Sequence, residues 1–218
     1  MQIESRTLQL LKNFSGINPS IAFKSGSVLK TMSPTKTIIA QANVEEEFPQ
    51  EFAIHDLSKF LAVLSLFDKP ELGFEPKLVT IASGKNKVKY TYCDPKHITL
   101  PPAKELKLPT SDVQFTLTPE MFSSTIKAMS VLGLPELLVV GSDGVLSLQA
   151  ADTKNKSGDT YVIEIGETDK NFTAIFKAEN LKILPGTYEV TISSKGFSHF
   201  KGDKLDYWIA IEATSTFE

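Results

Sequence analysis

The sequence is poor in the residues and segments that mark several common protein classes. Only one of its 218 residues is a cysteine, Cys93, so the chain cannot form an internal disulfide. Its first residues have neither the basic start nor the long apolar run of a secretory signal, and no segment is long and apolar enough to cross a bilayer. These absences predict a soluble, cytosolic protein.

Catalytic and nucleotide-binding motifs are also lacking. There is no Walker loop, no G-x-G-x-x-G and no G-x-S-x-G, and the three histidines lie in unrelated surroundings. Cys93 and His97 have a C-x-x-x-H spacing, but two ligands do not make a zinc site. We therefore predict no catalytic residue, no metal and no cofactor. An enzyme with a dispersed site stays open as an alternative, because the members of a triad need not be adjacent in sequence.

The chain also has no excess of positive charge, and it is poor in arginine. The net charge is −3, the sequence pI is about 5.7, and Arg6 is the only arginine, so bulk composition does not indicate a nucleic-acid partner. The hydrophobic fraction of 41% and the charged fraction of 22% are typical of a globular protein. A chain of this length forms one large domain or two of about 100 residues, and we favour two.

Four stretches have helical periodicity and helix boundary signals. They cover residues 5–17, 55–67, 118–130 and 177–186. The third has the strongest start, with Thr118 as the cap and Pro119 at the first helical position. In the first, Ser5 is the expected cap and Gly16 the expected stop.

The rest of the chain alternates as strands do, and the helices repeat. The third helix starts 113 residues after the first, and the fourth starts 122 residues after the second. These similar offsets predict an α+β fold with an internal duplication: domains 1–94 and 111–218, each with two helices on a mostly antiparallel sheet, and a proline-rich linker at 95–110. Free sheet edges at both ends would allow head-to-tail association into a ring.

Several segments together resemble a known family. "LLKNF", "IHDLSKFLAVLSL", "LPGTYEVTISSKG" and "DYWIAIEATST", in this order, are similar to the sliding clamp, or DNA polymerase processivity factor, of large tailed bacteriophages. The resemblance implies a DNA-clamp fold and a closed homotrimeric ring around duplex DNA. Such a ring tethers the replicative DNA polymerase during viral DNA replication in the cytoplasm of the infected bacterial host. It also implies a clamp-loader complex and late transcription factors as further partners, and no chemistry by the clamp itself.

The resemblance also implies that the helices line the hole of the ring. Flexible lysines suit a surface that slides on DNA, since bidentate arginine contacts would act as a brake. The candidate DNA-facing residues are Arg6, Lys12, Lys59, Lys127, Lys177, Lys182 and Lys195. The alternative interpretation is that these side chains only solubilise exposed helix faces.

Two further surfaces are predicted. In the family, partners insert peptide tails into an apolar pocket near the linker and the end of the chain. The residues that match this place are Ile98, Leu100, Pro101, Ile211 and Ala213. Edge strands around 87–93 and 159–166 are predicted to join the subunits through Tyr90, Tyr92, Tyr161 and Ile163. The alternative to a clamp is a β-rich peptide-binding or assembly module that does not enclose DNA.

Overall fold

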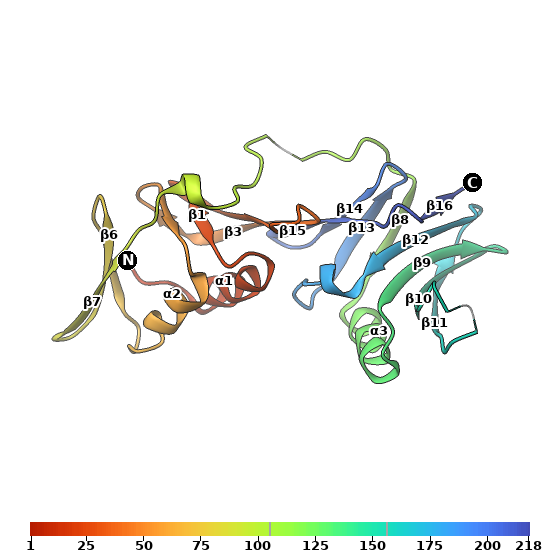
Figure 1. The fold of residues 1–218 in the computed structure, drawn as a ribbon, viewed down its shortest axis with the longest axis horizontal. Coiled ribbons are helices and arrows are strands. Elements are labelled where there is room, and N and C mark those ends of the chain that lie inside the picture. Colours follow the sequence, from red (N-terminus) through yellow and green to blue (C-terminus); the bar gives the residue numbers. More distant parts are fainter. Residues whose placement is uncertain (105, 156) are drawn as a thin grey trace. The chain divides into compact units, whose positions relative to one another are not determined.

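The computed structural model describes residues 1–104, 106–155 and 157–218, and the chain forms two compact units, Met1–Glu105 and Leu106–Glu218 (Figure 1). The predicted linker at 95–110 includes Glu105, which lies outside the described residues. The described part of this segment begins with a 3-10 turn, η1 (Pro95–His97). The Asp94 carboxylate accepts a hydrogen bond from the backbone N–H of Lys96 and so caps this turn.

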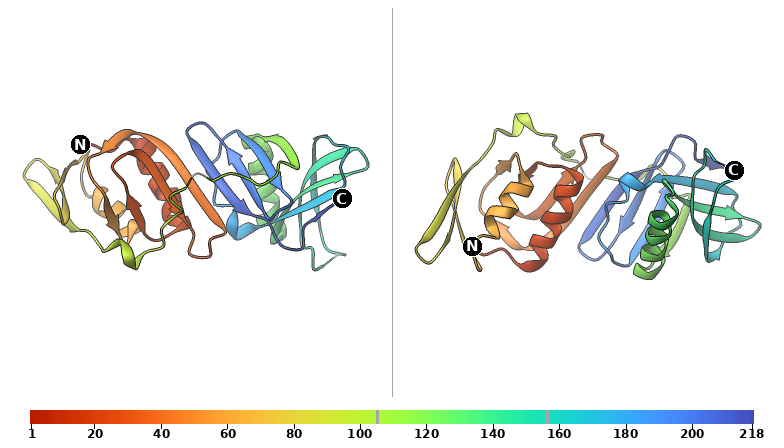
Figure 2. Two further views of the ribbon diagram at one scale, coloured as in Figure 1. Left: turned by 90° about the horizontal axis from the view of Figure 1, so that it is seen from above. Right: turned by 60° about the horizontal axis from the view of Figure 1, so that its bottom comes forward.

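The first unit is a set of small antiparallel sheets with two helices packed against each other. β1 pairs with β4, β2 pairs with β3, and β5, β6 and β7 form a three-stranded sheet in that order. Figure 2 shows α1 and α2 side by side. The bounds are α1 (Ser5–Ile17), β1 (Ile21–Phe23), β2 (Gly26–Met32), β3 (Ile38–Phe48), β4 (Phe52–Ile54), α2 (Leu57–Leu64), β5 (Glu71–Phe74), β6 (Leu78–Ser83) and β7 (Asn86–Thr91).

The second unit has two larger antiparallel arrays of strands. One has the order β11-β10-β9-β12-β16, and the other runs β15-β14-β13-β8. Helix α3 packs on β9, β10 and β11. The bounds are β8 (Val113–Leu117), α3 (Pro119–Leu132), β9 (Glu136–Ser142), β10 (Val145–Ala151), β11 (Tyr161–Glu167), β12 (Phe172–Lys177), η2 (Ala178–Asn180), β13 (Tyr188–Ser193), β14 (Phe197–Lys201), β15 (Leu205–Ala210) and β16 (Thr216–Phe217).

Helix α1 is capped by a residue from a distant strand. Glu46 of β3 is 7% exposed, and its carboxylate accepts hydrogen bonds from the Glu4 backbone N–H at 2.6 Å and from the Thr7 hydroxyl at 2.7 Å. The prediction that Ser5 caps the helix is therefore wrong, because Glu4 holds the cap position and Glu46 supplies the acceptor. Gly16 also lies within the helix, which ends at Ile17.

The other two helices are capped by residues that are close to them in sequence. The Asp56 carboxylate accepts a hydrogen bond from the Lys59 backbone N–H at the start of α2. The predicted cap of α3 is confirmed, since the Thr118 hydroxyl accepts from the Met121 N–H and Pro119 opens the helix. Gly133 ends α3 with a φ of 66°, a left-handed conformation that favours glycine.

The predicted fourth helix is wrong. The segment contains one 3-10 turn, η2, and within the described residues α3 is the only α-helix of the second unit. Strand β12 continues to Lys177, which pairs with Glu136 of β9, so the expected first turn belongs to the sheet. The residues left before Pro185 are too few to nucleate an independent helix.

Candidate functional site

The helices of the first unit expose the predicted basic residues and bury an apolar face. Arg6 and Lys12 are exposed on α1, and Lys59 is exposed on α2. The Arg6 guanidinium donates a hydrogen bond to the Gln9 side chain on the same helix. Phe14 of α1 and Phe60 of α2 are almost fully buried. The two helices therefore present lysine to solvent without an acidic residue in the first turn of either helix.

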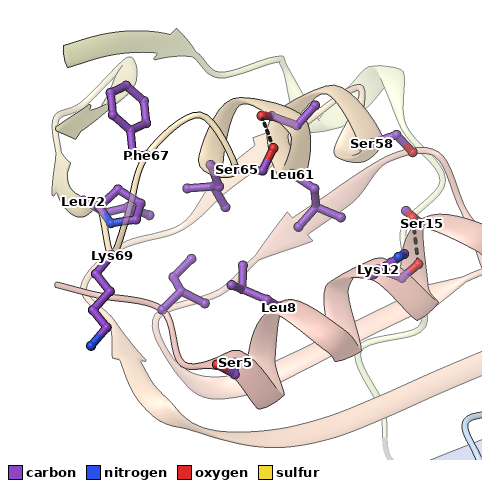
Figure 3. A pocket seen from close by; sticks show the side chains of 14 residues that line it. Ser5, Leu8, Lys12, Ser15, Ser58, Leu61, Ser65, Phe67, Lys69 and Leu72 are labelled. Atoms are coloured by element: carbon purple, nitrogen blue, oxygen red, sulfur yellow. Dashed lines mark hydrogen bonds between the residues drawn. The ribbon is translucent and has the colours of Figure 1, made fainter. Parts of the chain in front are cut away.

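A cleft of about 570 Å³ is lined by residues of both α1 and α2 (Figure 3). Its walls are mainly apolar, and the polar lining groups are serine hydroxyls and two lysine side chains. In the figure Leu8 and Leu61 approach each other across the cleft, and Lys69 points outward at one end. The lining residues are Ile3, Ser5, Leu8, Lys12, Ser15, Ser58, Leu61, Ala62, Leu64, Ser65, Phe67, Lys69, Pro70 and Leu72.

The basic candidates of the second unit are in different environments. Lys127 is exposed on α3. Lys177 and Lys182 lie on either side of η2, and the Lys177 ammonium forms an ion pair with Glu212 at 3.1 Å. The charge of Lys177 is therefore partly neutralised within the unit. No sequence pattern links Glu212 to Lys177, since the two residues are 35 positions apart.

Lys195 lies in the turn between β13 and β14, which a polar network holds in place. The Asp112 carboxylate accepts hydrogen bonds from the Thr110 hydroxyl and from the Ser194 backbone N–H. These two bonds are the main reason why the pKa of Asp112 lies below its usual value, and Lys170 adds to the effect. Lys195 donates its backbone N–H to the Ser193 hydroxyl, so its side chain extends from a fixed turn.

The linker segment covers a cavity of about 760 Å³ in the first unit. Leu100 and Pro101, two of the predicted pocket residues, line this cavity, whereas Ile98 is half-buried outside its lining. Ile211 and Ala213 belong to the second unit, where Ile211 is buried and Ala213 exposed. Leu100, which lines the cavity, is 46% exposed.

Stacked aromatic rings form one wall of the linker cavity. Phe52 stacks on Phe23 with ring centroids 4.4 Å apart and on Tyr92 with centroids 4.8 Å apart. The Tyr92 hydroxyl has no hydrogen-bond partner among the described residues. Burial raises the pKa of Tyr92 to about 12, and nearby Glu75 adds to the rise while Gln50 partly offsets it.

Two lysines line the same cavity. The Lys30 ammonium donates a hydrogen bond to the Pro102 carbonyl at 3.0 Å. Burial, with a smaller contribution from the neighbouring charge of Lys24, lowers the pKa of Lys30. Sequence reasoning missed Phe52, Lys24 and Lys30, because their only shared signal is proximity in the folded unit.

The strands nominated for subunit contacts lie at sheet edges. β7 is an edge of the three-stranded sheet, and β11 is an edge of the five-stranded array. Tyr90, Tyr161 and Ile163 are half-buried on these strands. Tyr92 follows β7 and lines the linker cavity, so the structure groups it with the cavity residues.

Two other features are absent from the described ranges 1–104, 106–155 and 157–218. These ranges contain no cluster of three or more histidine, cysteine, aspartate or glutamate side chains that could hold a metal ion. No helix in them is long and apolar enough to span a membrane.

Comparison with known proteins gives consistent results over both halves of the chain. Residues 4–100 match the DNA polymerase processivity factor family, and residues 114–213 match the family described as gp45 sliding clamp, C terminal. The sliding clamp of Vibrio phage KVP40 is 36% identical over 98% of this chain and 100% of its own length. The sliding clamp of Escherichia phage RB69 is 27% identical over 99% of each chain.

A solved structure extends the comparison to the fold. The PCNA of A. fulgidus, in a structure with the C-terminal region of FEN-1 bound, superposes with a TM-score of 0.70 at 14% identity and covers 96% of both chains. At this identity the likeness concerns the fold alone. The DNA-clamp fold inferred from the sequence is therefore confirmed for the chain.

Proposed function

Because the chain belongs to the sliding-clamp family of DNA polymerase processivity factors, we propose that three copies close into a homotrimeric ring around duplex DNA and tether the replicative polymerase. The main support for this proposal is that both halves of the chain match this family. In addition, α1, α2 and α3 each expose lysine opposite a buried apolar face. The family consists of accessory factors without catalysis. The proposed place of action is the cytoplasm of the infected bacterial host.

The lysines support sequence-independent holding of DNA. A ring that slides must make weak, exchangeable phosphate contacts, and lysine is a flexible, strongly hydrated point charge. Lys12, Lys59 and Lys127 are exposed helix residues and are the main proposed DNA-facing groups. Arg6, Lys182 and Lys195 are secondary, and Lys177 is the weakest candidate because its ion pair with Glu212 partly neutralises its charge.

The linker cavity is the proposed site for partner tails. It offers aromatic and aliphatic walls and a partly exposed Leu100, a combination suited to an apolar peptide anchor. We assign polymerase, clamp-loader subunits and late transcription factors to this cavity. Leu100 and Pro101 line it, and Ile98, Ile211 and Ala213 stay candidates from the sequence for contact with the same tails.

A topological experiment tests enclosure. The protein is loaded onto nicked circular DNA by a matching clamp loader and then separated from free protein by gel filtration. We expect it to stay with the circle and to leave when a restriction enzyme linearises the DNA. Equal retention on circular and linear DNA would contradict a closed ring.

A charge-reversal variant tests the DNA-facing face. Lys12→Glu combined with Lys127→Glu removes two exposed cations and adds two anions, so we expect loading onto DNA to fall at least tenfold. Lys36→Glu combined with Lys104→Glu is the control, because it changes the net charge equally at exposed positions outside the helices. Unchanged loading by the first variant would remove these lysines from the proposed interface.

A further inference from the structure

The cleft lined by α1 and α2 is open because most facing positions of the two helices carry small side chains. On each helix the lining residues recur at helical intervals, so they form one continuous helix face. The largest apolar side chains of the two helices, Phe14 and Phe60, are buried in the core instead. The helix residues that line the cleft are Ser5, Leu8, Lys12 and Ser15 of α1 and Ser58, Leu61, Ala62, Leu64 and Ser65 of α2.

The cleft changes in character along its length. Figure 3 shows Lys12 and Ser15 at one end and Phe67 and Leu72 at the other, with the two facing leucines between them. A molecule that matches this order has a polar group at one end and an apolar body behind it.

The apolar walls are still partly in contact with water. Ile3, Leu8, Leu61 and Phe67 are half-buried, and all four line the cleft. A ligand with an apolar body would remove this surface from water, which is favourable in proportion to the area covered.

The charge of the lining has one sign. Lys12 and Lys69 are exposed cations, and no aspartate or glutamate is among the lining residues. Among the described residues, neither ammonium has an ion-pair partner within the chain. Asp56, at the start of α2, lies outside the lining and accepts the Lys59 backbone N–H as the helix cap. The cleft therefore complements an anion.

The serine hydroxyls add little to ligand binding. Ser15 donates its hydroxyl hydrogen to the Lys12 carbonyl, and Ser65 donates to the Ala62 carbonyl, each at 2.8 Å. Both hydrogens are thus used within their own helices. The lysines remain as the charged donors of the cleft, and Lys69 points outward at the apolar end (Figure 3).

The linker cavity also has two lysines in its lining, but it suits an anion less well. Glu51 is among its lining residues, and the Lys30 ammonium already donates to the Pro102 carbonyl. Of the two spaces, only the cleft beside α1 combines cations with a lining free of carboxylates.

We propose that this cleft binds one free fatty-acid carboxylate of medium chain length, with the carboxylate on Lys12 and the acyl chain along Leu8 and Leu61 toward Leu72. Its volume of about 570 Å³ is in the usual range of small-molecule pockets. An ammonium–carboxylate pair beside apolar walls is stronger than the same pair in open water. The site lies within one unit and needs neither the ring nor DNA, although a bound carboxylate would neutralise one of the proposed DNA-facing cations.

A simpler explanation is that the cleft holds only water and that Lys12 faces solvent or DNA. In that case any small anion should bind equally weakly, and the length of its apolar chain should have no effect. The two explanations therefore differ in a measurable way.

A ligand series tests the proposal by isothermal titration calorimetry on the full-length chain without DNA or loader. We expect decanoate to bind at one site per chain with a Kd on the order of 10–100 μM. Butyrate should bind at least ~100-fold more weakly, because each buried CH₂ group contributes about fourfold in affinity. Decyltrimethylammonium, with the same chain and the opposite charge, should show no saturable binding. All ligands are kept below the concentrations at which they form micelles.

Three results of this series would overturn the proposal. They are equal affinities of decanoate and butyrate, equal affinities of decanoate and decyltrimethylammonium, and no saturable decanoate binding up to about 1 mM. None of them bears on ring closure, which the circular-DNA experiment tests separately.

A cleft-filling variant locates the site. Ala62 is exposed in the cleft wall, so Ala62→Trp should fill the space without disturbing the core and weaken decanoate binding at least ~10-fold. Val131→Trp places the same side chain at an exposed position of α3 and should bind decanoate as the wild type does. Far-UV circular dichroism and urea midpoints check that both variants are folded. Unchanged binding by Ala62→Trp would place the ligand elsewhere and overturn the proposal.

Lysine variants test the orientation of the ligand. Lys12→Ala should weaken decanoate binding about fivefold to tenfold, because it removes the partner of the carboxylate. Lys69→Ala should change the affinity less than about twofold, since this side chain points outward. Lys89→Ala, exposed on β7 and outside the lining, is the control for net charge. A larger loss from Lys69→Ala than from Lys12→Ala would contradict the proposed placement of the carboxylate.

Discussion

Helices α1 and α3 are the longest helices described in their units, yet different parts of the sequence hold their first turns. α3 has its cap in the preceding residue, Thr118, whereas α1 depends on Glu46, which lies 39 positions beyond Thr7. The start of α1 is therefore formed only when β3 is in place. Ser5 and Leu8 line the cleft beside α2, so the tertiary cap also fixes one wall of that cleft.

The largest expected effect is at the tertiary cap. Glu46→Ala leaves the Glu4 N–H and the buried Thr7 hydroxyl without their acceptor, which should lower the free energy of unfolding by about 2–3 kcal/mol. Urea denaturation followed by circular dichroism measures this loss. Glu47→Ala, at the exposed neighbouring position, is the control. Equal stability of the two variants would show that the cap contributes nothing.

The local cap of α3 should have a smaller effect. Thr118→Ala removes one acceptor at an accessible helix start, where water can replace it, so we expect a loss of about 1 kcal/mol. The same denaturation experiment measures it, with Thr118→Ser as the variant that keeps the hydroxyl. A loss as large as that of Glu46→Ala would remove the distinction between the two helices.

Glycine substitutions should have opposite signs in the two helices. Gly133 has a φ of 66°, so Gly133→Ala should destabilise the protein by about 1 kcal/mol. Gly16 lies inside α1 with open space around the position of a Cβ, and Gly16→Ala should stabilise it by ~0.5–1 kcal/mol. Thermal midpoints of the two variants check the signs, and a shift in the same direction would contradict this account.

The smallest expected effect is that of Asp112, in the network beside Lys195, on the pH dependence of stability. The folded-state pKa of Asp112 is depressed, so its stabilising contribution is present above the unfolded pKa of about 3.9 and is lost as pH falls through the folded pKa. We expect Asp112→Asn to reduce the free energy of unfolding at neutral pH. In the acid range, the free energy of unfolding of this variant should change less with pH than that of the wild type. Urea midpoints across the acid range, compared with Asp143→Asn, test this. A profile parallel to the wild type would exclude Asp112 as a contributor.

The sequence predicted what short-range patterns determine. Thr118 and Pro119 identify the start of α3 because cap and helix are adjacent. The helical periodicity at 177–186 predicted a helix wrongly, because β12 extends to Lys177 through pairing with Glu136. Periodicity within the segment does not reveal that sheet pairing competes with helix formation there. Amphipathic spacing was present there, but sheet pairing determined the result.

The candidate sites show the same limit. The exposed lysines of α1, α2 and α3 were identifiable from helical spacing alone. The linker cavity combines residues from β1, β2, β4 and the segment after β7, so Phe52 and Lys30 had no sequence signal that linked them to Leu100. Glu46 and Glu212 were missed for the same reason, since each acts on a partner far along the chain.

Cys93 is half-buried in the wall of the linker cavity, and it is the only thiol of the chain. Burial raises its pKa, so little thiolate forms at neutral pH and alkylation should be slow. Because the chain contains no other thiol, a maleimide fluorophore attached to Cys93 by prolonged labelling would report from the cavity wall without any engineered cysteine. If partner tails occupy the cavity as we propose, they should protect the thiol from labelling, and Cys93 would then serve as a footprinting probe for them.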